Sequence, residues 1–278
     1  MGELQAMLRE QAFRADAILL QEVDSTLLKP LARLCRHGTR IVWNRLAATP
    51  NELAGLGFEV DGAGARYAPR WPIKGLVEAG TVEPTDCVVV GAGLAGSAVA
   101  ASLALRGWRV QVLDAGDTPA AGASSLPAGL LAPHQSPDDN LLSRLSRSGV
   151  RTTLQACERL LAQGRDWAPT GVLEQRGDDR RPVPDVHSLA AWTREADADQ
   201  MRAAGLPADA SAWWHATAGW VKPAALVQAW LAEDAIQFRG GCAVHGIVRE
   251  GADWCVRGKD GSTLARATLV VVAAAGGS

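Results

Sequence analysis

Three glycines and one aspartate have the types and spacing of a cofactor site. Gly91, Gly93 and Gly96 form a G-x-G-x-x-G motif directly after the apolar run 87–90, and Asp114 follows eighteen residues after Gly96. The first glycine permits a tight turn, the second lets the backbone approach a pyrophosphate, and the third lets helix and strand pack closely. The positive end of the following helix favours phosphate charge, and Asp114 can accept a hydrogen bond from a ribose hydroxyl. The spacing predicts a site for an adenine dinucleotide.

The residues around this motif predict a βαβ unit. The run 87–90 is a strand, 97–106 a helix, Gly107 its stop and 109–113 a second strand. This context distinguishes the motif from an isolated match. The alternative is a glycine-rich turn in some other α/β unit.

Composition limits the classes of protein to which the chain can belong. The 278 residues carry a net charge of −2, so no global basic field attracts nucleic acid, and any RNA contact must come from a local patch. The five cysteines are odd in number and lack a C-x-x-C spacing, which indicates a reducing compartment without a disulfide frame or zinc site. No apolar stretch is long enough to span a membrane. We expect a soluble, cytoplasmic protein without a metal.

The N-terminal part predicts a small α/β region of its own. We expect helices at 4–14, 27–35 and 51–56, and strands at 17–20, 39–43 and 58–60. Residues 61–85 are rich in glycine and proline and are interpreted as a connector.

Two segments of the central part suggest further contacts. The long loop 116–137 contains small and hydroxyl residues, which favours close approach to the cofactor over a plain surface loop. The helix predicted at 140–162 carries several arginines, which we expect to form a solvated face, with an RNA patch as the alternative. The adjacent Trp213 and Trp214 could stack on a base, although buried packing between domains is favoured. Residues 165–218 give no clear pairing.

The C-terminal part predicts a helix that begins at Pro223, followed by strands at 242–248, 254–257 and 264–273. The last strand is continuously apolar over 269–272, as a buried parallel sheet requires. Its small-residue end is expected to abut the dinucleotide at the carboxyl edge of that sheet.

These motifs together resemble a known family. The glycine motif, Gly122-Ala123-Ser124, the Gly-Trp-Val-x-Pro start at 219–223 and the closing Val-Val-Val-x-Ala-x-Gly at 270–276 are similar to FAD-dependent amine oxidases such as D-amino acid and glycine oxidases. More narrowly, the chain resembles bifunctional tRNA-modification proteins in which a methyltransferase domain precedes such an oxidoreductase.

The resemblance implies a fold class and a division into domains. The fold is α/β, a Rossmann-like FAD-binding domain with a partial α+β substrate domain, preceded by a short methyltransferase-like remnant. Residues 1–75 would be that remnant, 76–85 a linker and 86–278 an incomplete oxidoreductase domain with a substrate-domain insertion at about 165–218.

The resemblance also implies the contacts of FAD. The pyrophosphate would lie on the glycine motif, the adenosine ribose on Asp114, the flavin beside the Gly-Ala-Ser loop, adenine near one valine backbone, and two C-terminal residues would close over the cofactor. The implied residues are Gly91, Gly93, Leu94, Ala95, Gly96, Asp114, Gly122, Ala123, Ser124, Val244, Ala275 and Gly276.

The implied reaction removes the carboxymethyl group from 5-carboxymethylaminomethyl-2-thiouridine at the wobble position of tRNA. Hydride would pass from the carbon beside the secondary amine to the flavin, and hydrolysis of the imine would release glyoxylate. The alternatives are oxidation of a free small amine or amino acid, or a non-catalytic FAD-binding fragment. The oligomeric state stays open.

Several positions depart from the family pattern. The family's Asp-Gly-Phe-Ala-Pro motif is replaced by Leu-Gln-Glu-Val-Asp at 20–24, so we do not expect methyl transfer. Ser125 and Leu126 stand where the family has glycine and asparagine. We expect a fragment of a longer product or a decayed copy. His134 and His215 could act as acid–base groups, but without a partner carboxylate in sequence they identify no catalytic residue.

Overall fold

The structure, a computed structural model, describes residues 14–62, 64–73, 83–176, 191–207 and 210–274. The chain divides into two compact units, Met1–Val82 and Glu83–Ser278. Each unit has hydrophobic clusters built only from its own residues. Within the described residues, every helix is too short or too polar to cross a membrane.

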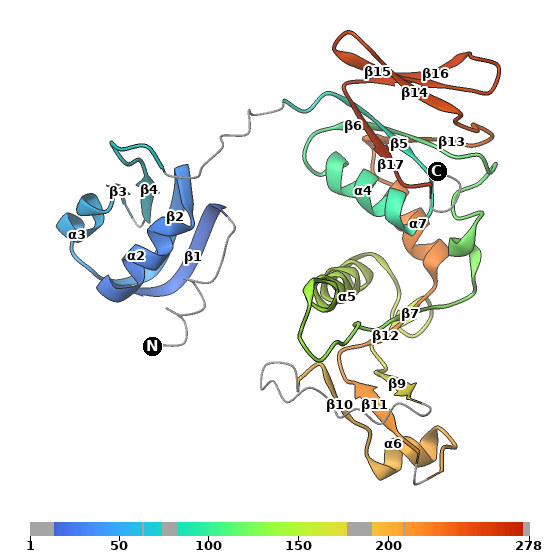
Figure 1. Cartoon of the computed structure of the whole chain (residues 1–278), viewed down its shortest axis with the longest axis horizontal. Coiled ribbons are helices and arrows are strands. Elements are labelled where there is room, and N and C mark those ends of the chain that lie inside the picture. The colour runs from blue at the N-terminus through green and yellow to red at the C-terminus, as the bar shows by residue number, and fades with distance from the viewer. Residues whose placement is uncertain (1–13, 63, 74–82, 177–190, 208–209, 275–278) are drawn as a thin grey trace. The chain divides into compact units, whose positions relative to one another are not determined.

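The described residues of the first unit form a four-stranded sheet with two helices, in the strand order β1-β2-β4-β3. Strands β1 and β2 run parallel, and the other neighbours are antiparallel. The elements, drawn in blue to blue-green in Figure 1, are β1 (Ala15–Asp24), α2 (Ser25–Arg33), β2 (Cys35–Ala47), α3 (Pro50–Gly55), β3 (Phe58–Asp61) and β4 (Gly64–Tyr67).

Local chemistry sets the boundaries of both helices. Helix α2 begins earlier than the sequence predicted because the Asp24 carboxylate accepts hydrogen bonds from the Thr26 and Leu27 amides. Helix α3 begins with a capping box between Thr49 and Glu52. The helix predicted at 4–14 lies almost entirely outside the described residues.

The connector predicted at 61–85 is wrong in its first part, because β4 lies there. Strand β4 pairs with β2 on one side and with β3 on the other. Ala65 and Tyr67 are buried, and a Cβ added to Gly64 would lie 2.5 Å from the Ile41 carbonyl oxygen. Glycine thus permits close strand pairing here instead of marking a loop.

The second unit contains a parallel sheet in the order β13-β6-β5-β17. Its strands are β5 (Asp86–Val90), β6 (Arg109–Leu113), β13 (Ile236–Arg239) and β17 (Leu269–Val272). Figure 1 shows α4 (Leu94–Ala104) and α7 (Pro223–Leu231) on one side of this sheet. The other side carries an antiparallel sheet of β14 (Gly246–Glu250), β15 (Asp253–Arg257) and β16 (Thr263–Ala267). The predicted α/β fold is confirmed.

The alternating faces of β5 explain its continuous apolar run. Cys87 and Val89 belong to the hydrophobic cluster that includes Ala100 of α4. Val88 and Val90 belong to another cluster, which includes Val256 of β15 in the antiparallel sheet β14-β15-β16. Strands covered on both faces need apolar residues at every position.

The strand predicted at 264–273 is two strands in different sheets. Strand β16 (Thr263–Ala267) is antiparallel to β15 (Asp253–Arg257), whereas β17 is parallel to β5. The chain passes between the sheets at Thr268, whose Oγ1 lies 2.7 Å from Thr85 Oγ1. Strand β14 (Gly246–Glu250) also begins later than predicted. Strand β13 was missed because it is only four residues long, although its alternation of apolar and polar residues is a strand signal.

Two small antiparallel sheets and α5 (Leu141–Leu160) make up the remainder of this unit. The first sheet has the order β7-β12-β8 and the second the order β10-β11-β9, with α6 beside the second. Their elements are β7 (Gly129–Leu131), β8 (Trp167–Ala168), β9 (Val172–Gln175), β10 (Thr193–Glu195), α6 (Ala198–Ala203), β11 (Ala212–His215) and β12 (Gly219–Val221).

The arginines of α5 do not all lie on a solvated face. Arg147 is buried and binds Asp139 at 2.6 Å and Gln135 at 3.2 Å, so it anchors the helix to the preceding loop. Arg144 and Arg151 are exposed. The predicted solvated face is therefore wrong at Arg147.

We expect Phe58→Ala to lower the unfolding free energy of the first unit by about 3–5 kcal/mol, because a buried aromatic ring is replaced by a cavity. Phe58 is 2% exposed, and its ring packs against the Tyr67 ring in a tilted arrangement with 4.9 Å between the ring centroids. Scanning calorimetry of the full chain should show a lower transition for this unit and an unchanged one for the second. The control Leu19→Ala, at a side chain 79% exposed, should change stability by less than about 0.5 kcal/mol. Equal effects of the two variants would contradict this assignment of the core.

Candidate cofactor site

The glycine loop after β5 lies where three segments meet. Gly91 has φ +108° and donates its N–H to the Leu113 carbonyl at 2.7 Å. Ala273, just after β17, donates its N–H to the Val90 carbonyl at 2.7 Å. A Cβ added to Gly91 would lie 2.5 Å from the Ala273 carbonyl oxygen. Both the positive φ and this close approach require glycine.

Gly96 brings α4 against the loop. A Cβ added to it would lie 1.8 Å from the Gly91 carbonyl oxygen and 3.4 Å from a Val89 methyl group. No other residue fits without moving the helix. The absence of a side chain at Gly96 therefore sets how closely α4 approaches β5.

The N-terminus of α4 is open to a ligand. Gly93 is its N-cap, with extended backbone and no side-chain capping bond. A Cβ added to Gly93 would meet only Ser124 Oγ, at 3.2 Å. The Leu94 amide donates to the same oxygen at 3.1 Å, and Ala95 is exposed. A hydroxyl oxygen thus lies where a helix N-terminus favours an anionic oxygen.

Asp114, directly after β6, binds the backbone of the glycine loop through its carboxylate. Its Oδ2 accepts the Ala92 amide at 2.6 Å and its Oδ1 accepts the Gly116 amide at 2.8 Å. Each carboxylate oxygen has a second lone pair, so both can still accept a ribose hydroxyl. The predicted ribose ligand is therefore also a structural part of the glycine loop, which sequence reasoning missed.

The structure brings most of the predicted cofactor residues to one edge of the sheet. Gly122 and Ala123 are exposed beside Ser124, at the short 3₁₀ turn η1 (Ala123–Ser125). Val244 is partly buried, and the neighbouring Cys242 amide donates to the Asp114 carbonyl at 2.8 Å.

Two predicted residues, Ala275 and Gly276, lie outside the described residues. The chain leading to them is placed by Ala273, which abuts Gly91. The end of β17 thus lies against the glycine loop at the carboxyl edge of the sheet, and its expected contact with the dinucleotide stays a prediction.

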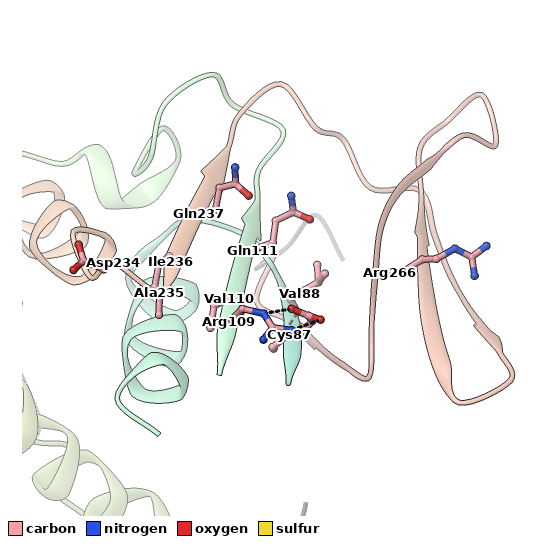
Figure 2. Close-up of a pocket in the computed structure, with 11 residues that line it drawn as sticks. Cys87, Val88, Arg109, Val110, Gln111, Asp234, Ala235, Ile236, Gln237 and Arg266 are labelled. Carbon is pink, nitrogen blue, oxygen red and sulfur yellow. Dashed lines mark hydrogen bonds and ion pairs between the residues drawn. The ribbon is translucent and has the colours of Figure 1, made fainter. Parts of the chain in front are cut away.

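A separate cavity of about 450 Å³ lies at the opposite, amino edge of the parallel sheet. Figure 2 shows Gln111 and Gln237 pointing to the same side from neighbouring strands, whereas the side chain of Arg266, from β16, points away from them. Asp86 and Arg109 form a bidentate pair with N–O distances of 2.8 and 2.9 Å, which lowers the pKa of Asp86. Because dinucleotides bind at the carboxyl ends of parallel strands, this cavity is not the cofactor site.

The two histidines form hydrogen bonds with side chains of neighbouring segments. His215 is 1% exposed, with Nε2 at 2.9 Å from Glu174 Oε2 and Nδ1 at 2.9 Å from Thr193 Oγ1. Burial raises the pKa of Glu174, but hydrogen bonds from His215 and Arg176 outweigh this and lower it below its usual value. His134 is exposed and bonds Ser143 at 3.1 Å. Among the described residues, none of these hydrogen bonds reaches the glycine loop.

Within the described part of the chain, neither the cysteine thiols nor potential metal ligands form a second functional site. The five cysteines are free and buried, and burial raises the pKa of Cys35 to about 12. No group of three or more His, Cys, Asp or Glu side chains among the described residues could hold a metal ion.

Residues 86–278 match a protein family described as FAD dependent oxidoreductase. The chain belongs to this family. FAD is therefore its cofactor, and the glycine loop, the open N-terminus of α4 and the carboxylate of Asp114 have the donors, space and acceptor that FAD requires. The predicted resemblance to FAD-dependent amine oxidases is confirmed.

Curated relatives of this family member match its whole length. It is 45% identical over 306 residues to the tRNA 5-methylaminomethyl-2-thiouridine biosynthesis bifunctional protein MnmC of Polaromonas naphthalenivorans (strain CJ2), covering 100% of this chain and 48% of that protein. The protein of the same name from Paracidovorax citrulli (strain AAC00-1) is 45% identical over 313 residues, covering 100% and 49%. The chain thus spans about half the length of the curated relatives it matches.

Solved structures show the same fold. Glycine oxidase from Geobacillus kaustophilus gives a TM-score of 0.51 at 21% identity, covering 69% of this chain and 56% of that one. Fructosamine oxidase (Amadoriase II) from Aspergillus fumigatus gives 0.53 at 20% identity, covering 70% and 50%. At these identities the likeness concerns the fold alone.

We expect Gly93→Ala to weaken FAD binding while leaving the apo fold intact. The backbone of Gly93 suits any residue, but the added methyl group occupies the approach to the pyrophosphate. The dissociation constant, measured by quenching of flavin fluorescence, should rise roughly tenfold, equivalent to about 1.4 kcal/mol. The control Gly149→Ala adds a methyl group in α5 with nothing within 4 Å, and should bind FAD normally. Equal affinities of both variants would refute this role of Gly93.

We expect Asp114→Asn to destabilise the second unit by about 1–3 kcal/mol, because the amide supplies one carbonyl acceptor for two backbone N–H donors. FAD affinity should fall as well. Urea unfolding of the apoprotein and FAD titration measure the two effects. The exposed Asp117→Asn is the matched control. An Asp114→Asn protein as stable as this control would show that the two backbone contacts contribute nothing.

Proposed function

We propose that this chain supplies the FAD-binding part of an oxidoreductase that modifies the wobble uridine of tRNA. The observation that carries the proposal is the match at 45% identity, over the whole chain, to bifunctional proteins named for tRNA 5-methylaminomethyl-2-thiouridine biosynthesis. The geometry of the glycine loop supports it, because the carboxyl edge of the parallel sheet is built for a dinucleotide.

The described residues have distinct roles in this proposal. The amides at the start of α4, next to Gly93, bind the pyrophosphate, and Gly91 and Gly96 keep the backbone close enough for that contact. Asp114 binds the adenosine ribose while it holds the Ala92 amide. Ser124 exchanges its contact with Leu94 for one with the cofactor.

The reaction we propose is removal of the carboxymethyl group from 5-carboxymethylaminomethyl-2-thiouridine. Bound FAD supplies an acceptor for hydride from the methylene carbon of the carboxymethyl group, beside the secondary amine. Water then hydrolyses the resulting imine, which leaves the aminomethyl group on the uridine and releases the two-carbon part as glyoxylate. The described residues of this chain bind and orient, and we assign none of them a proton-transfer step.

We also propose the division into a methyltransferase-like remnant at 1–75, a linker at 76–85 and an oxidoreductase domain at 86–278 with an insertion at about 165–218. The start of the family match at residue 86 and the separation of the two units after Val82 support it. The relatives that match both units are named as bifunctional proteins.

The visible absorption spectrum of the purified chain, with and without added FAD, is the first test. We expect flavin bands that co-elute with the protein. Anaerobic addition of tRNA that carries 5-carboxymethylaminomethyl-2-thiouridine should then bleach these bands and release glyoxylate, whereas tRNA without the modification should not.

Other outcomes of this experiment would refute the proposal. Bleaching by glycine or sarcosine but not by the modified tRNA would identify an oxidase of free amines. Flavin that remains oxidised with every substrate would identify a non-catalytic FAD-binding fragment. A protein that takes up no FAD would show that this chain by itself does not form the site.

A further inference from the structure

A cavity of about 530 Å³ lies between α5 and the ends of the two small sheets, and none of its lining residues belongs to the glycine loop, η1 or β17. We call it the tryptophan cleft. The residues that define it are Arg151, Gln155, Glu158, Trp167, Trp192 and Thr217.

One wall of the tryptophan cleft is a single face of α5. Arg151, Gln155 and Glu158 are four and three residues apart, so their side chains leave the helix on the same side. This wall provides a cation, an amide and a carboxylate in a row. These groups can together meet a ligand that has both hydrogen-bond acceptors and donors.

The opposite wall is held by backbone hydrogen bonds. The Ala216 amide donates to the Trp192 carbonyl at 3.1 Å, and the Gly164 amide donates to the Trp167 carbonyl at 2.8 Å. The backbones of both tryptophans are thereby fixed where two strands of different sheets begin, because Trp167 is the first residue of β8 and Trp192 directly precedes β10. The position of this wall therefore depends on where β8 and β10 begin.

The aromatic and cationic groups of the cleft lie together. The guanidinium carbon of Arg151 lies 5.3 Å from the centroid of the Trp192 ring, and this ring is only partly buried. The guanidinium lies over the face of the ring, and a flat heterocycle can stack on an aromatic ring or on an arginine guanidinium plane. By contrast, Trp213 is buried beneath Arg176 at 4.0 Å, and Trp214 leaves β11 on the opposite side, so these two do not form the pair expected from sequence.

Two of the lining residues carry buried polar atoms without a protein partner. Trp167 is 5% exposed, and its Nε1 has no hydrogen-bond acceptor within the described part of the chain. Thr217 Oγ1 is likewise unpartnered among those residues. Because native proteins rarely leave such atoms unsatisfied, two of them in the lining of one cavity indicate a polar ligand.

We propose that the tryptophan cleft binds an unpaired nucleobase of RNA. The base stacks on Trp192, the polar groups of Gln155, Glu158 and Thr217 meet its edge, and Arg151 meets the ring or the adjoining phosphate. The inference rests on the proposed tRNA substrate, and it adds a second RNA contact on residues outside the cofactor site. Single-stranded RNA binds in preference to duplex, because paired bases do not present a free face.

The test is fluorescence anisotropy of the full chain with a fluorescein-labelled single-stranded octaribonucleotide and with its duplex. Trp192→Ala should weaken binding of the single strand roughly five- to 150-fold, the range found for loss of one base–aromatic stack. Trp192→Phe should restore most of the affinity, since a flat ring returns. Thr217→Val, which keeps the shape of the side chain, should also weaken binding.

The matched control is Arg144→Ala, an exposed arginine of the same helix outside the cleft. We expect a change of about twofold or less, because an isolated exposed charge is screened by salt. Far-UV circular dichroism and FAD uptake should be unchanged in Trp192→Ala. The proposal is overturned if Trp192→Ala binds like Arg144→Ala, if the duplex binds as tightly as the single strand, or if neither RNA binds.

The outcome is separable from that of the proposed function. If the modified tRNA bleaches the flavin but RNA binding does not depend on Trp192, the proposed oxidoreductase function stands and the proposed RNA site in the cleft is wrong. If single-stranded RNA binds through Trp192 but no tRNA bleaches the flavin, the proposed RNA site stands and the proposed reaction is wrong.

Discussion

The contact between Gly96 and the carbonyl oxygen of Gly91 is the constraint on which the second unit depends. It leaves no room for a side chain, so α4 lies directly against the end of β5. That position points the first amides of α4 at the carboxyl edge of the sheet, where the helix dipole favours an anion. If the helix stood further away, the loop could not form a phosphate site, and the apolar residues of β5 that face α4 would lose their packing.

The same edge is completed by segments far apart in the sequence. Asp114 ties the loop to the end of β6, its own carbonyl accepts from Cys242, and Ala273 closes the far side beside Gly91. Each of these contacts uses backbone atoms of its partner. A site made mainly of backbone groups tolerates change in side chains but not in the positions of the strands, which the packing on both sheet faces secures.

The cavity at the amino edge of the sheet and the tryptophan cleft differ in how many of their polar groups have a partner within the protein. At the amino edge, Asp86 and Arg109 pair with each other, and Arg266 pairs with Glu250, so these four charges are already compensated. In the tryptophan cleft, an indole nitrogen and a hydroxyl group lack partners among the described residues. Satisfied charges stabilise a surface, whereas unsatisfied polar atoms leave binding energy for a ligand.

Residue spacing alone determined the βαβ unit, the glycine loop and the acidic residue after the second strand. These features are local: a strand, a turn and a helix within thirty residues are set by hydrophobic pattern, glycine positions and caps. The start of α7 at Pro223 and most of α5 were predictable for the same reason. Resemblance to a family, not periodicity, supplied the predicted cofactor contacts at Ser124 and Val244.

Tertiary structure decided what depends on partners distant in sequence. The break at Thr268 between β16 and β17, the role of β4 inside a sheet and the inclusion of β13 each depend on which strand lies alongside, and an apolar run does not specify its neighbour. The same reason explains why Arg147 is buried and why Trp192 is only partly buried whereas Trp213 is 5% exposed. Sequence determined which groups can bind a dinucleotide, and only the packing of separate segments decided which of them meet.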